Sequence, residues 1–413
     1  MDRISGMEKT WSARMVPLNK VFPQNPTRTQ LRPIMVQSAI VKALETRFLN
    51  KLQDYLTYQL DRSQTGFVKN MGIQVNLTRT LERITPRTKK GRIVYGVFID
   101  FSNAYNSVPH TALFKKLREK KILPEKEISY IEQLYARYRI KIGKNLLKTN
   151  KGVAQGSMIS PALFNIYIED LSIELGEKAN INIEDRLLYA DDVLLFTTSI
   201  KQTKEAIEIV ENWARKNGMT LNKRKSGIII FVNRRTTKPP FMQKPKEAKG
   251  IISWISTQKT INDIPVCDKY KYLGTWLNSK LTIDPQINHI RKKAAHIYVK
   301  LYPYLMSASA DARKDMWQTM VAPLFNAAYI LLEYEPSESH KLKLERVQRS
   351  TFKQFMMISK RTSTELINDM MRKDLRKIAK TVVATSKKQW EERKGYQEIM
   401  TQLPNLSRKN GMR

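Results

Sequence analysis

The chain has 413 residues, which exceeds the usual size of one hydrophobic core. Its net charge is +35, from 73 Lys and Arg against 38 Asp and Glu, so it should bind a polyanion. Nucleic acid is the favoured partner, and an anionic membrane surface is the weaker alternative. Its single cysteine, Cys267, excludes an intrachain disulfide and a Cys-rich zinc site and is typical of an intracellular, reducing compartment. The sequence has no apolar run near about 18 residues and no signal-peptide core, so it predicts neither a membrane span nor secretion. The alternative interpretation of the charge is a ribosome-associated or merely soluble basic protein.

The first predicted elements are a long helix and a buried strand. Residues 28–62 begin with a Pro-containing turn and then carry apolar residues at helical spacing between positions 40 and 56, which predicts one long helix with a basic face. The β-rich run "RIVYGVFIDFS", residues 92–102, predicts a strand that stops at Asp100. A second helix is expected over about 111–120.

The middle of the chain alternates between helical and strand patterns. A glycine-bearing loop, residues 151–161, precedes a helical run over 162–175, and "LLYADDVLLF", residues 187–196, is typical of a hairpin with two aspartates at its turn. An amphipathic helix over 201–217 and a buried strand over 225–232 follow. This order predicts an α+β sandwich with helices on one face of an antiparallel sheet.

The last part of the chain is predicted to be helical and basic. Residues 234–250 are rich in Pro and Lys and indicate an exposed connection. From Asp284 onward the apolar residues follow helical spacing, with repeated basic faces such as "HKLKLERVQRSTFKQF".

The paired aspartates, Asp191 and Asp192, are the most unusual feature of the sequence, because apolar strand residues flank a pair of charges. An isolated "ADD" would be an ordinary turn, since Asp is a common turn residue. However, Asp100 also stands where an apolar strand stops, and the next residue, Phe101, offers a backbone carbonyl. Carboxylate oxygens are suitable ligands for Mg²⁺, and two such ions can activate a 3'-hydroxyl and stabilise a leaving pyrophosphate. Together with the positive charge, this pattern indicates polynucleotide synthesis.

Seven sequence blocks in order resemble the reverse transcriptases of non-LTR retrotransposons and their group II intron relatives. Between residues 12 and 370 they are "ARMVPLNK" with "QLRPIMVQSAIVKALETRF", "QTGFVKNMG", "GVFIDFSNAYNSVPHTALFKKL", "KGVAQGSMISPALFNIYIEDL", "LLYADDVLLF", "GMTLNKRKSGIIIF" and "YKYLGTWLNSKL". The resemblance implies a right-hand polymerase with fingers, an antiparallel palm sheet and a thumb, followed by a mostly helical basic region. The expected units are an N-terminal arm with fingers over 1–91, the catalytic palm with part of the fingers over 92–282, the thumb start over 283–310, and the helical basic region over 311–413.

The resemblance also assigns roles to individual residues. It implies that Asp100, Asp191, Asp192 and the Phe101 carbonyl hold two Mg²⁺ ions, with Mn²⁺ as a substitute, and that Lys225 protonates the leaving pyrophosphate. The implied nucleotide-binding residues are Arg32, Lys69, Tyr105, Gln155 and Gly156. The implied primer and template contacts are Tyr272, Leu273, Gly274, Arg291, Lys292 and Lys293.

Some of these residues also allow a plainer interpretation. Tyr105 matches the aromatic residue beneath the incoming sugar, where a ring excludes a 2'-hydroxyl, but it is also compatible with a core tyrosine. Lys225 is also compatible with a solvated basic turn. Arg32 and Lys69 are also compatible with nonspecific contacts to phosphate.

The resemblance predicts an RNA-directed DNA polymerase whose partners are an RNA template, a DNA or RNA primer and dNTPs. Asn106, Ser157 and Met158 depart from commoner residues of the family, which leaves the subfamily open without removing a metal ligand. A non-catalytic RNA-binding or maturase-like protein on the same scaffold is the alternative, and Tyr105 disfavours an RNA polymerase. We recognise no nuclease unit in the sequence, which leaves three alternatives: a processed or reduced element, a domesticated enzyme, or a partner of a separately encoded nuclease. The oligomeric state stays open.

Overall fold

The computed structural model describes most of the chain with its side chains. The described residues are 12–19, 25–27, 31–142, 145–233, 260–334, 336–371 and 375–409. The connection predicted over 234–250 lies outside them.

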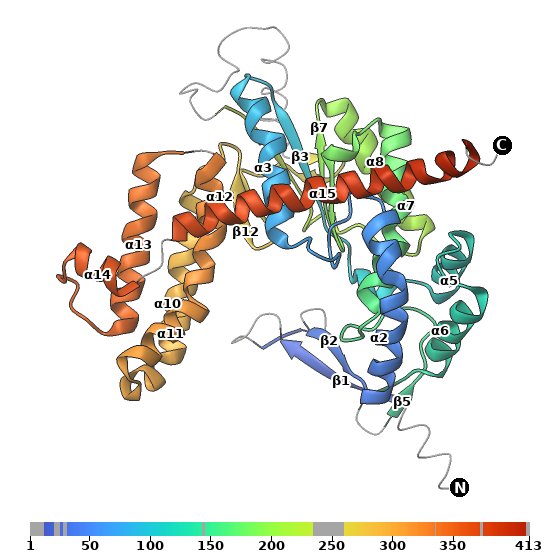
Figure 1. The fold of residues 1–413 in the computed structure, drawn as a ribbon, viewed down its shortest axis with the longest axis horizontal. Helices are drawn as coiled ribbons and strands as arrows, with labels where there is room; N and C mark the ends of the chain where they lie inside the picture. The colour runs from blue at the N-terminus through green and yellow to red at the C-terminus, as the bar shows by residue number, and fades with distance from the viewer. Residues whose placement is uncertain are drawn as a thin grey trace.

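A four-stranded antiparallel sheet, here the palm sheet, forms the centre of the molecule (Figure 1). Its strands, in spatial order, are β6 (Arg186–Tyr189), β7 (Asp192–Thr197), β3 (Val94–Ile99) and β8 (Gly227–Phe231). The predicted strands before Asp100 and over 225–232 are confirmed as β3 and β8, and the predicted hairpin is confirmed as β6 and β7. Every residue of β3 is buried, because the run of Val, Ile and aromatic residues has contacts above and below the sheet.

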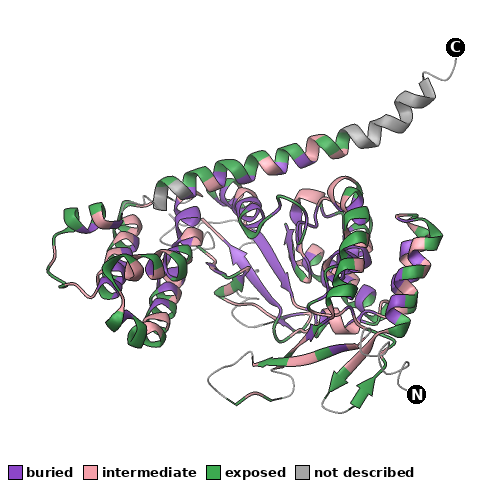
Figure 2. Ribbon diagram, turned by 60° about the horizontal axis from the view of Figure 1, so that its bottom comes forward, coloured by how far each residue is buried: buried purple, intermediate pink, exposed green. Residues whose placement is uncertain are grey.

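Helices cover both faces of the palm sheet, so the predicted single helical face is wrong. On one face, Val97 and Ile99 join the core formed with α7 (Ser160–Ala179) and α8 (Ile200–Lys216). On the other face, Phe98 belongs to a second core. The helices that contribute to this second core are α3 (Ile73–Lys89), α12 (Asn326–Tyr334) and α15 (Leu375–Lys409). Figure 2 shows the buried strands enclosed between more exposed helices.

The expected helix over 28–62 is wrong in its first part, because residues 31–36 form a strand. This strand, β2 (Leu31–Val36), pairs antiparallel with β1 (Ser12–Asn19). The sequence predicted a Pro-containing turn before the helical spacing that starts at residue 40, and it contains no local sign of a strand partner earlier in the chain. The helix α2 (Ala39–Asp54) begins only after Ser38, whose side chain accepts a hydrogen bond from the backbone N–H of Val41.

A second four-stranded sheet, here the fingers sheet, has the order β2-β1-β4-β5, and none of its four strands was predicted from the sequence. The remaining elements before residue 283 are η2 (Tyr55–Gln59), α4 (Ala104–Ser107), α5 (His110–Glu119), α6 (Glu125–Arg137), β4 (Arg139–Ile142), β5 (Asn145–Leu147), η3 (Ile183–Asp185), β9 (Thr260–Ile261), β10 (Ile264–Pro265), β11 (Lys269–Tyr272) and β12 (Thr275–Asn278). The helices expected over 111–120, 162–175 and 201–217 are confirmed as α5, α7 and α8.

The predicted helical C-terminal part is confirmed. Its elements are α10 (Asp284–Ser307), α11 (Ala310–Met320), η5 (Ala322–Phe325), α12, α13 (Glu338–Met356), α14 (Thr364–Met371) and α15. Helices α10 to α14 share a core of their own around Trp317, Phe352 and Phe355. The long helix α15 then runs back across the palm, over α3 (Figure 1). None of the helices in the described ranges is both long and apolar enough to cross a membrane.

Candidate active site at the edge of the palm sheet

Asp100 is held at the end of β3 by the turn that precedes β8. Its backbone N–H donates to the Ser226 hydroxyl at 3.1 Å, and its carbonyl accepts from the Asn222 N–H at 2.8 Å. The next residue, Phe101, is buried and forms an antiparallel bridge with Leu221. This bridge uses the Asp100 carbonyl and the Ser102 N–H and not the Phe101 carbonyl, so the predicted role of that carbonyl stays a prediction.

The adjacent aspartates Asp191 and Asp192 lie at a tight hairpin turn. Tyr189 pairs with Asp192 across the hairpin, which leaves Ala190 and Asp191 as the turn residues. Ala190 has a φ of 55°, a left-handed conformation that a non-glycine residue adopts only when its surroundings hold it. The Gln64 side chain supplies this restraint, because its Oε1 accepts from the Ala190 N–H at 2.8 Å and its Nε2 donates to the Ala190 carbonyl at 3.2 Å.

Close packing keeps the same turn in place. A Cβ atom on Gly66 would lie 2.3 Å from the Ala190 nitrogen and 2.8 Å from the Tyr189 carbonyl carbon. Only glycine therefore allows the chain around Gly66 to lie against the hairpin. Neither role was predicted from the sequence, although Gln64 and Gly66 lie in the block "QTGFVKNMG" together with the predicted Lys69.

The three aspartates interact electrostatically. Burial raises the pKa of Asp191, and the charge of Asp100 raises it further, whereas Arg32 lowers it. Burial, followed by the charges of Asp191 and Asp100, raises the pKa of Asp192 to about 7. The Asp192 side chain is partly open to solvent, so water reduces the amount by which burial raises its pKa. The site therefore concentrates negative charge in a strongly basic protein.

This donor set suits a hard divalent cation. Among the residues that the structure describes, no three Asp, Glu, His or Cys side chains stand close enough together to hold a metal ion as they are arranged. The chemistry of Asp100, Asp191 and Asp192 nevertheless fits Mg²⁺, because they offer only oxygen donors. Their mutual repulsion also adds to burial in raising the pKa values of Asp191 and Asp192. A bound cation would relieve that repulsion.

The raised pKa of Asp192 predicts that the metal-free protein loses stability as the pH rises. Burial and the charges of Asp191 and Asp100 raise the pKa of this carboxyl from its ordinary value of 3.8 toward about 7. The folded state therefore binds more protons than the unfolded chain between these values, and stability falls as pH rises through that window. In chelator, Asp192→Asn should be more stable than wild type near pH 8, with the difference shrinking near pH 5.

Urea unfolding of wild type and variant at both pH values measures this difference in the free energy of unfolding. Asp54→Asn, which removes an exposed carboxylate on α2, is the matched control and should show no such trend. An equal stability difference for Asp192→Asn at both pH values would contradict the raised pKa.

A cavity of about 530 Å³ opens beside the aspartate turn and collects many of the predicted residues. Those that line it are Arg32, Tyr105, Gln155, Gly156, Asp191, Asp192 and Leu273. The predicted residues Asp100, Lys69 and Lys225 are not part of its lining. The fingers strand β2, the loop before α7 and the palm hairpin thus meet at one place.

Tyr105 forms a rigid part of this cavity. Its ring stacks on Phe164 with centroids 4.6 Å apart and an interplanar angle of 8°. Burial raises the pKa of its hydroxyl, and the nearby charge of Asp191 raises it further, so the phenol stays neutral. The structure is compatible with both interpretations of Tyr105. One face of its ring packs against the core, and the residue also lines the cavity.

The loop that carries Gln155 and Gly156 is fixed to the fingers strand. The Met35 N–H donates to the Gln155 carbonyl at 2.7 Å. Gly156 has a φ of 112°, and a Cβ there would lie 2.5 Å from the Met35 carbonyl oxygen, so glycine is required on both grounds. The buried Glu45, which the sequence analysis also missed, accepts from the Met158 N–H at 2.9 Å and from Gln37 at 2.8 Å.

The basic turn before β8 distinguishes Lys225 from its neighbour. Lys223 pairs with Glu211 at 3.1 Å and Asp263 at 3.2 Å. Lys225 lies next to Ser226, the residue that holds Asp100, and its carbonyl accepts from the Tyr270 hydroxyl at 2.9 Å. Lys223 is thus occupied by carboxylates, and the role of Lys225 as a proton donor stays a prediction.

Of the predicted primer contacts at the β11–β12 turn, Tyr272 is buried, whereas Leu273 and Gly274 are at least partly exposed. Tyr272 is buried at 2% exposure, and its hydroxyl accepts from the Asn76 amide at 3.1 Å. The structure therefore corrects the interpretation of Tyr272, whose side chain packs in the core. Leu273 and Gly274 form the turn between β11 and β12, with φ values of 46° and 80°.

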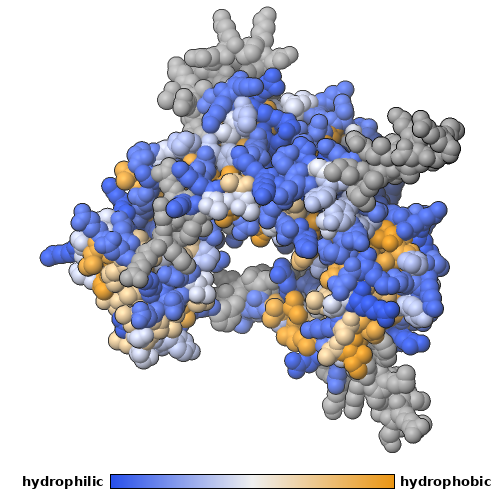
Figure 3. All heavy atoms as spheres, viewed as in Figure 1, coloured by the Kyte–Doolittle hydropathy of each residue, from blue (hydrophilic) through white to orange (hydrophobic). Residues whose placement is uncertain are grey.

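The predicted duplex contacts on α10 are exposed. They are Arg291, Lys292 and Lys293. Partial burial and the charges of Lys271 and Lys293 lower the pKa of His289, so this part of α10 is crowded with positive charge. In the space-filling view, an opening separates these C-terminal helices from the β1–β2 pair, with hydrophilic residues along much of its rim (Figure 3).

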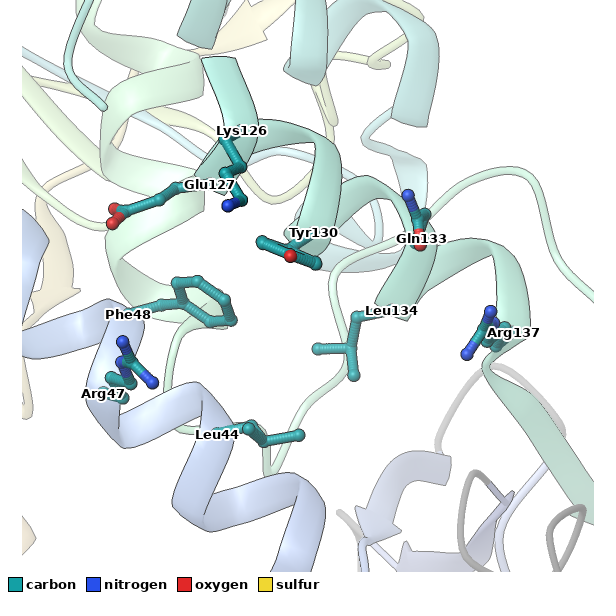
Figure 4. Close-up of a pocket in the computed structure, with 9 residues that line it drawn as sticks. All are labelled: Leu44, Arg47, Phe48, Lys126, Glu127, Tyr130, Gln133, Leu134 and Arg137. Atoms are coloured by element: carbon teal, nitrogen blue, oxygen red, sulfur yellow. The ribbon is translucent and has the colours of Figure 1, made fainter. Parts of the chain in front are cut away.

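A second cavity of about 540 Å³ lies away from the aspartates, between α2 and α6 (Figure 4). Phe48 and the exposed Tyr130 line it together with Arg47 and Arg137. Its carboxylate, Glu127, pairs with Lys51. The cavity therefore lacks the group of carboxylates that distinguishes the first one.

Comparison with known proteins identifies the family of the chain. The family model described as reverse transcriptase (RNA-dependent DNA polymerase) matches residues 23–277. The chain is 24% identical over 266 residues to the Pol polyprotein of an R2 retrotransposable element from Nasonia vitripennis, which covers 62% of this chain and 25% of the relative. It is 24% identical over 367 residues to the RNA-directed DNA polymerase from mobile element jockey of Drosophila melanogaster, covering 84% and 38%. The chain thus spans less than half the length of either relative.

Solved structures with a similar course of the chain include telomerase from Candida tropicalis. The apo form has a TM-score of 0.46 at 12% identity, with 91% of this chain and 66% of that chain covered. The form in complex with a fragment of telomeric RNA has a TM-score of 0.45 at 14% identity, with 93% and 64% covered.

Proposed function

Because the chain belongs to the reverse transcriptase family, we propose that it is an RNA-directed DNA polymerase that extends a primer 3'-hydroxyl with dNTPs on an RNA template. The observation that carries this proposal is that Asp100 ends β3 beside the β6–β7 turn that carries Asp191 and Asp192, so that the three charges interact. The adjoining cavity, with Arg32 and Tyr105, supplies a place for the nucleotide.

The three aspartates would hold Mg²⁺ in the proposed reaction. When bound, two such ions supply positive charge that activates the 3'-hydroxyl and stabilises the leaving pyrophosphate, and Mn²⁺ is a reasonable substitute. The primer 3'-oxygen forms a bond to the α-phosphorus of the dNTP. At the same time the bond between the α-phosphorus and the oxygen that bridges to the β-phosphate breaks, and pyrophosphate leaves. Arg32, a residue of β2, lines the cavity. Its charge already acts on Asp191 and can attract the triphosphate.

Other residues would hold the nucleotide and the nucleic acid. We assign Gln155 and Gly156 to the nucleotide pocket, and Lys69 and Lys225 to the triphosphate and the departing pyrophosphate. The turn at Leu273 would support the primer end. The basic face of α10 would contact the duplex backbone, where each phosphate contact releases counterions.

Tyr105 should select deoxynucleotides by exclusion of the 2'-hydroxyl. Tyr105→Val removes the ring from the cavity, so we expect the preference for dNTPs over rNTPs to fall by at least about tenfold. Tyr105→Phe keeps the ring and its stacking on Phe164, so it should keep the preference. Single-nucleotide incorporation with matched dNTP and rNTP measures the ratio. An unchanged ratio in Tyr105→Val would show that another residue selects the sugar.

The proposed activity is tested by giving the purified chain a DNA primer on an RNA template and, separately, measuring RNA binding on the same preparation. Mg²⁺-dependent extension supports the polymerase. RNA binding without any incorporation would instead indicate the non-catalytic scaffold. A reducing compartment and a separately encoded nuclease also remain our proposals, and Cys267, which is partly buried, requires no oxidising environment.

A further inference from the structure

The C-terminal helix α15 is joined to the palm by specific polar contacts as well as by apolar packing. Arg79 of α3 stacks over the Trp390 ring, 3.6 Å from its centroid. Lys387 pairs with Glu82 of α3 at 2.8 Å. One turn beyond Trp390, Arg393 is buried at 4% exposure. A buried arginine needs acceptors, because its desolvation is otherwise costly.

The acceptors of Arg393 are backbone carbonyls of the segment that precedes α3. Its guanidinium donates to the Gln64 carbonyl at 2.7 Å and to the Leu60 carbonyl at 3.4 Å. Gln397, one helical turn further on, also donates to the Leu60 carbonyl, at 2.8 Å. Helix α15 therefore fixes the backbone of residues 60–64 through these three hydrogen bonds.

The same short segment also contacts the hairpin that carries the aspartate turn. The Leu188 N–H donates to the Ser63 carbonyl and the Thr65 N–H donates to the Leu188 carbonyl, both at 2.9 Å, which makes a parallel bridge to β6. The Gln64 side chain then holds both backbone polar groups of Ala190. Arg393 and Ala190 thus bind the same residue, Arg393 through its backbone and Ala190 through its side chain.

We propose that α15 is a positioning element for the active site, in which Arg393 holds Gln64 so that Gln64 can keep the Ala190–Asp191 turn in its left-handed conformation. Arg393 and Gln64 are positioning residues, since neither lines the cavity. The kinetic part of this inference rests on the proposed function, whereas the structural part concerns the turn alone. The turn needs such support because Ala190 has a φ of 55° and like charges flank it.

The structural part is tested by hydrogen exchange of the full-length, metal-free protein. Arg393→Ala and Gln64→Ala should each speed amide exchange in the peptide that covers residues 186–196, because the Ala190 N–H loses a fixed acceptor. Gln397→Ala removes one bond to Leu60 and should act in the same direction but more weakly. Lys387→Ala is the matched control, since it removes an α15 ion pair that does not touch the 60–66 segment, and it should leave the hairpin unchanged.

The kinetic part is tested by primer extension at saturating template. Arg393→Ala should lower kcat by about tenfold to a hundredfold, the range expected when a reacting group is misplaced by up to about 1 Å, while the KM for dNTP stays within about twofold. Arg393→Lys, which can still donate to one carbonyl, should recover part of kcat. The double variant with Gln64→Ala should be no slower than the worse single variant, because both act through one contact.

These outcomes separate the inference from general stability and from the proposed function. Wild-type exchange in 186–196 for both Arg393→Ala and Gln397→Ala would overturn it, and so would an equal increase in Lys387→Ala. If Arg393→Ala does not fold, the ordering of Gln397→Ala and Lys387→Ala still decides. If the wild-type chain makes no DNA, the proposed function fails, yet the exchange result still supports or overturns the coupling of α15 to the turn.

Discussion

Asp191→Asn is expected to abolish primer extension while it leaves template binding intact. The substitution keeps the size of the side chain but removes the charge that would hold Mg²⁺, at the turn between β6 and β7. Loss of one preorganised electrostatic group lowers rates by about 100-fold to 1,000-fold in other enzymes, and a lost metal ligand should be at least as severe. Rates of single-nucleotide addition on an RNA template measure the effect.

A matched control separates the role of Asp191 from the effect of one lost charge. Asp54→Asn removes an exposed carboxylate on α2, far along the chain from the hairpin. It should extend primers at the wild-type rate. Because the protein carries a net charge of +35, both variants should bind RNA at least as tightly as wild type. Undiminished synthesis by Asp191→Asn would contradict the assignment of the active site.

Gly66→Ala is expected to have the second largest effect, although Gly66 bears no functional group. The added methyl group would lie 2.3 Å from the Ala190 nitrogen, which is backbone and cannot rotate away. Either the 60–66 segment or the aspartate turn must move. We expect overpacking to lower the free energy of unfolding by about 1–3 kcal/mol and the extension rate by about 100-fold.

Gly395→Ala is the control for this prediction. Gly395 lies inside α15, and nothing stands within 4 Å of where its Cβ would be. Replacement of an unhindered helical glycine by alanine stabilises a helix by about 0.5–1 kcal/mol. Extension by Gly395→Ala should therefore stay at the wild-type rate. If Gly66→Ala also kept the wild-type rate, close packing against the hairpin would not matter for catalysis.

The sequence was sufficient to predict the parts of the site that depend on local pattern. The strand before Asp100 and the hairpin around Asp191 are short runs of strand-forming residues that stop at charges, and both are confirmed. The resemblance added Tyr105 and Gln155, which the structure places in the cavity beside the aspartates. These predictions succeeded because each element is specified by its own residues.

The errors concern contacts between distant parts of the chain. Residues 31–36 pair with β1 as a strand, where the sequence predicted a Pro-containing turn that leads into a helix. Tyr272 matches a family position, yet its ring lies in the core against Phe98, with centroids 5.6 Å apart. The contact between Gln64 and Ala190 spans 126 positions and that between Arg393 and Gln64 spans 329. One sequence offers no local signal for such pairings.

Synthesis of DNA on a defined RNA is the most direct test of the central claim, that this cluster of aspartates serves an RNA-directed DNA polymerase. The purified chain is given a heteropolymeric RNA template with an annealed DNA primer, all four dNTPs and Mg²⁺, and the product is sequenced. The predicted result is DNA complementary to the RNA, absent in chelator and absent with Asp191→Asn. A wild-type protein that binds the primed RNA but yields no complementary DNA in Mg²⁺ or Mn²⁺ would contradict the claim.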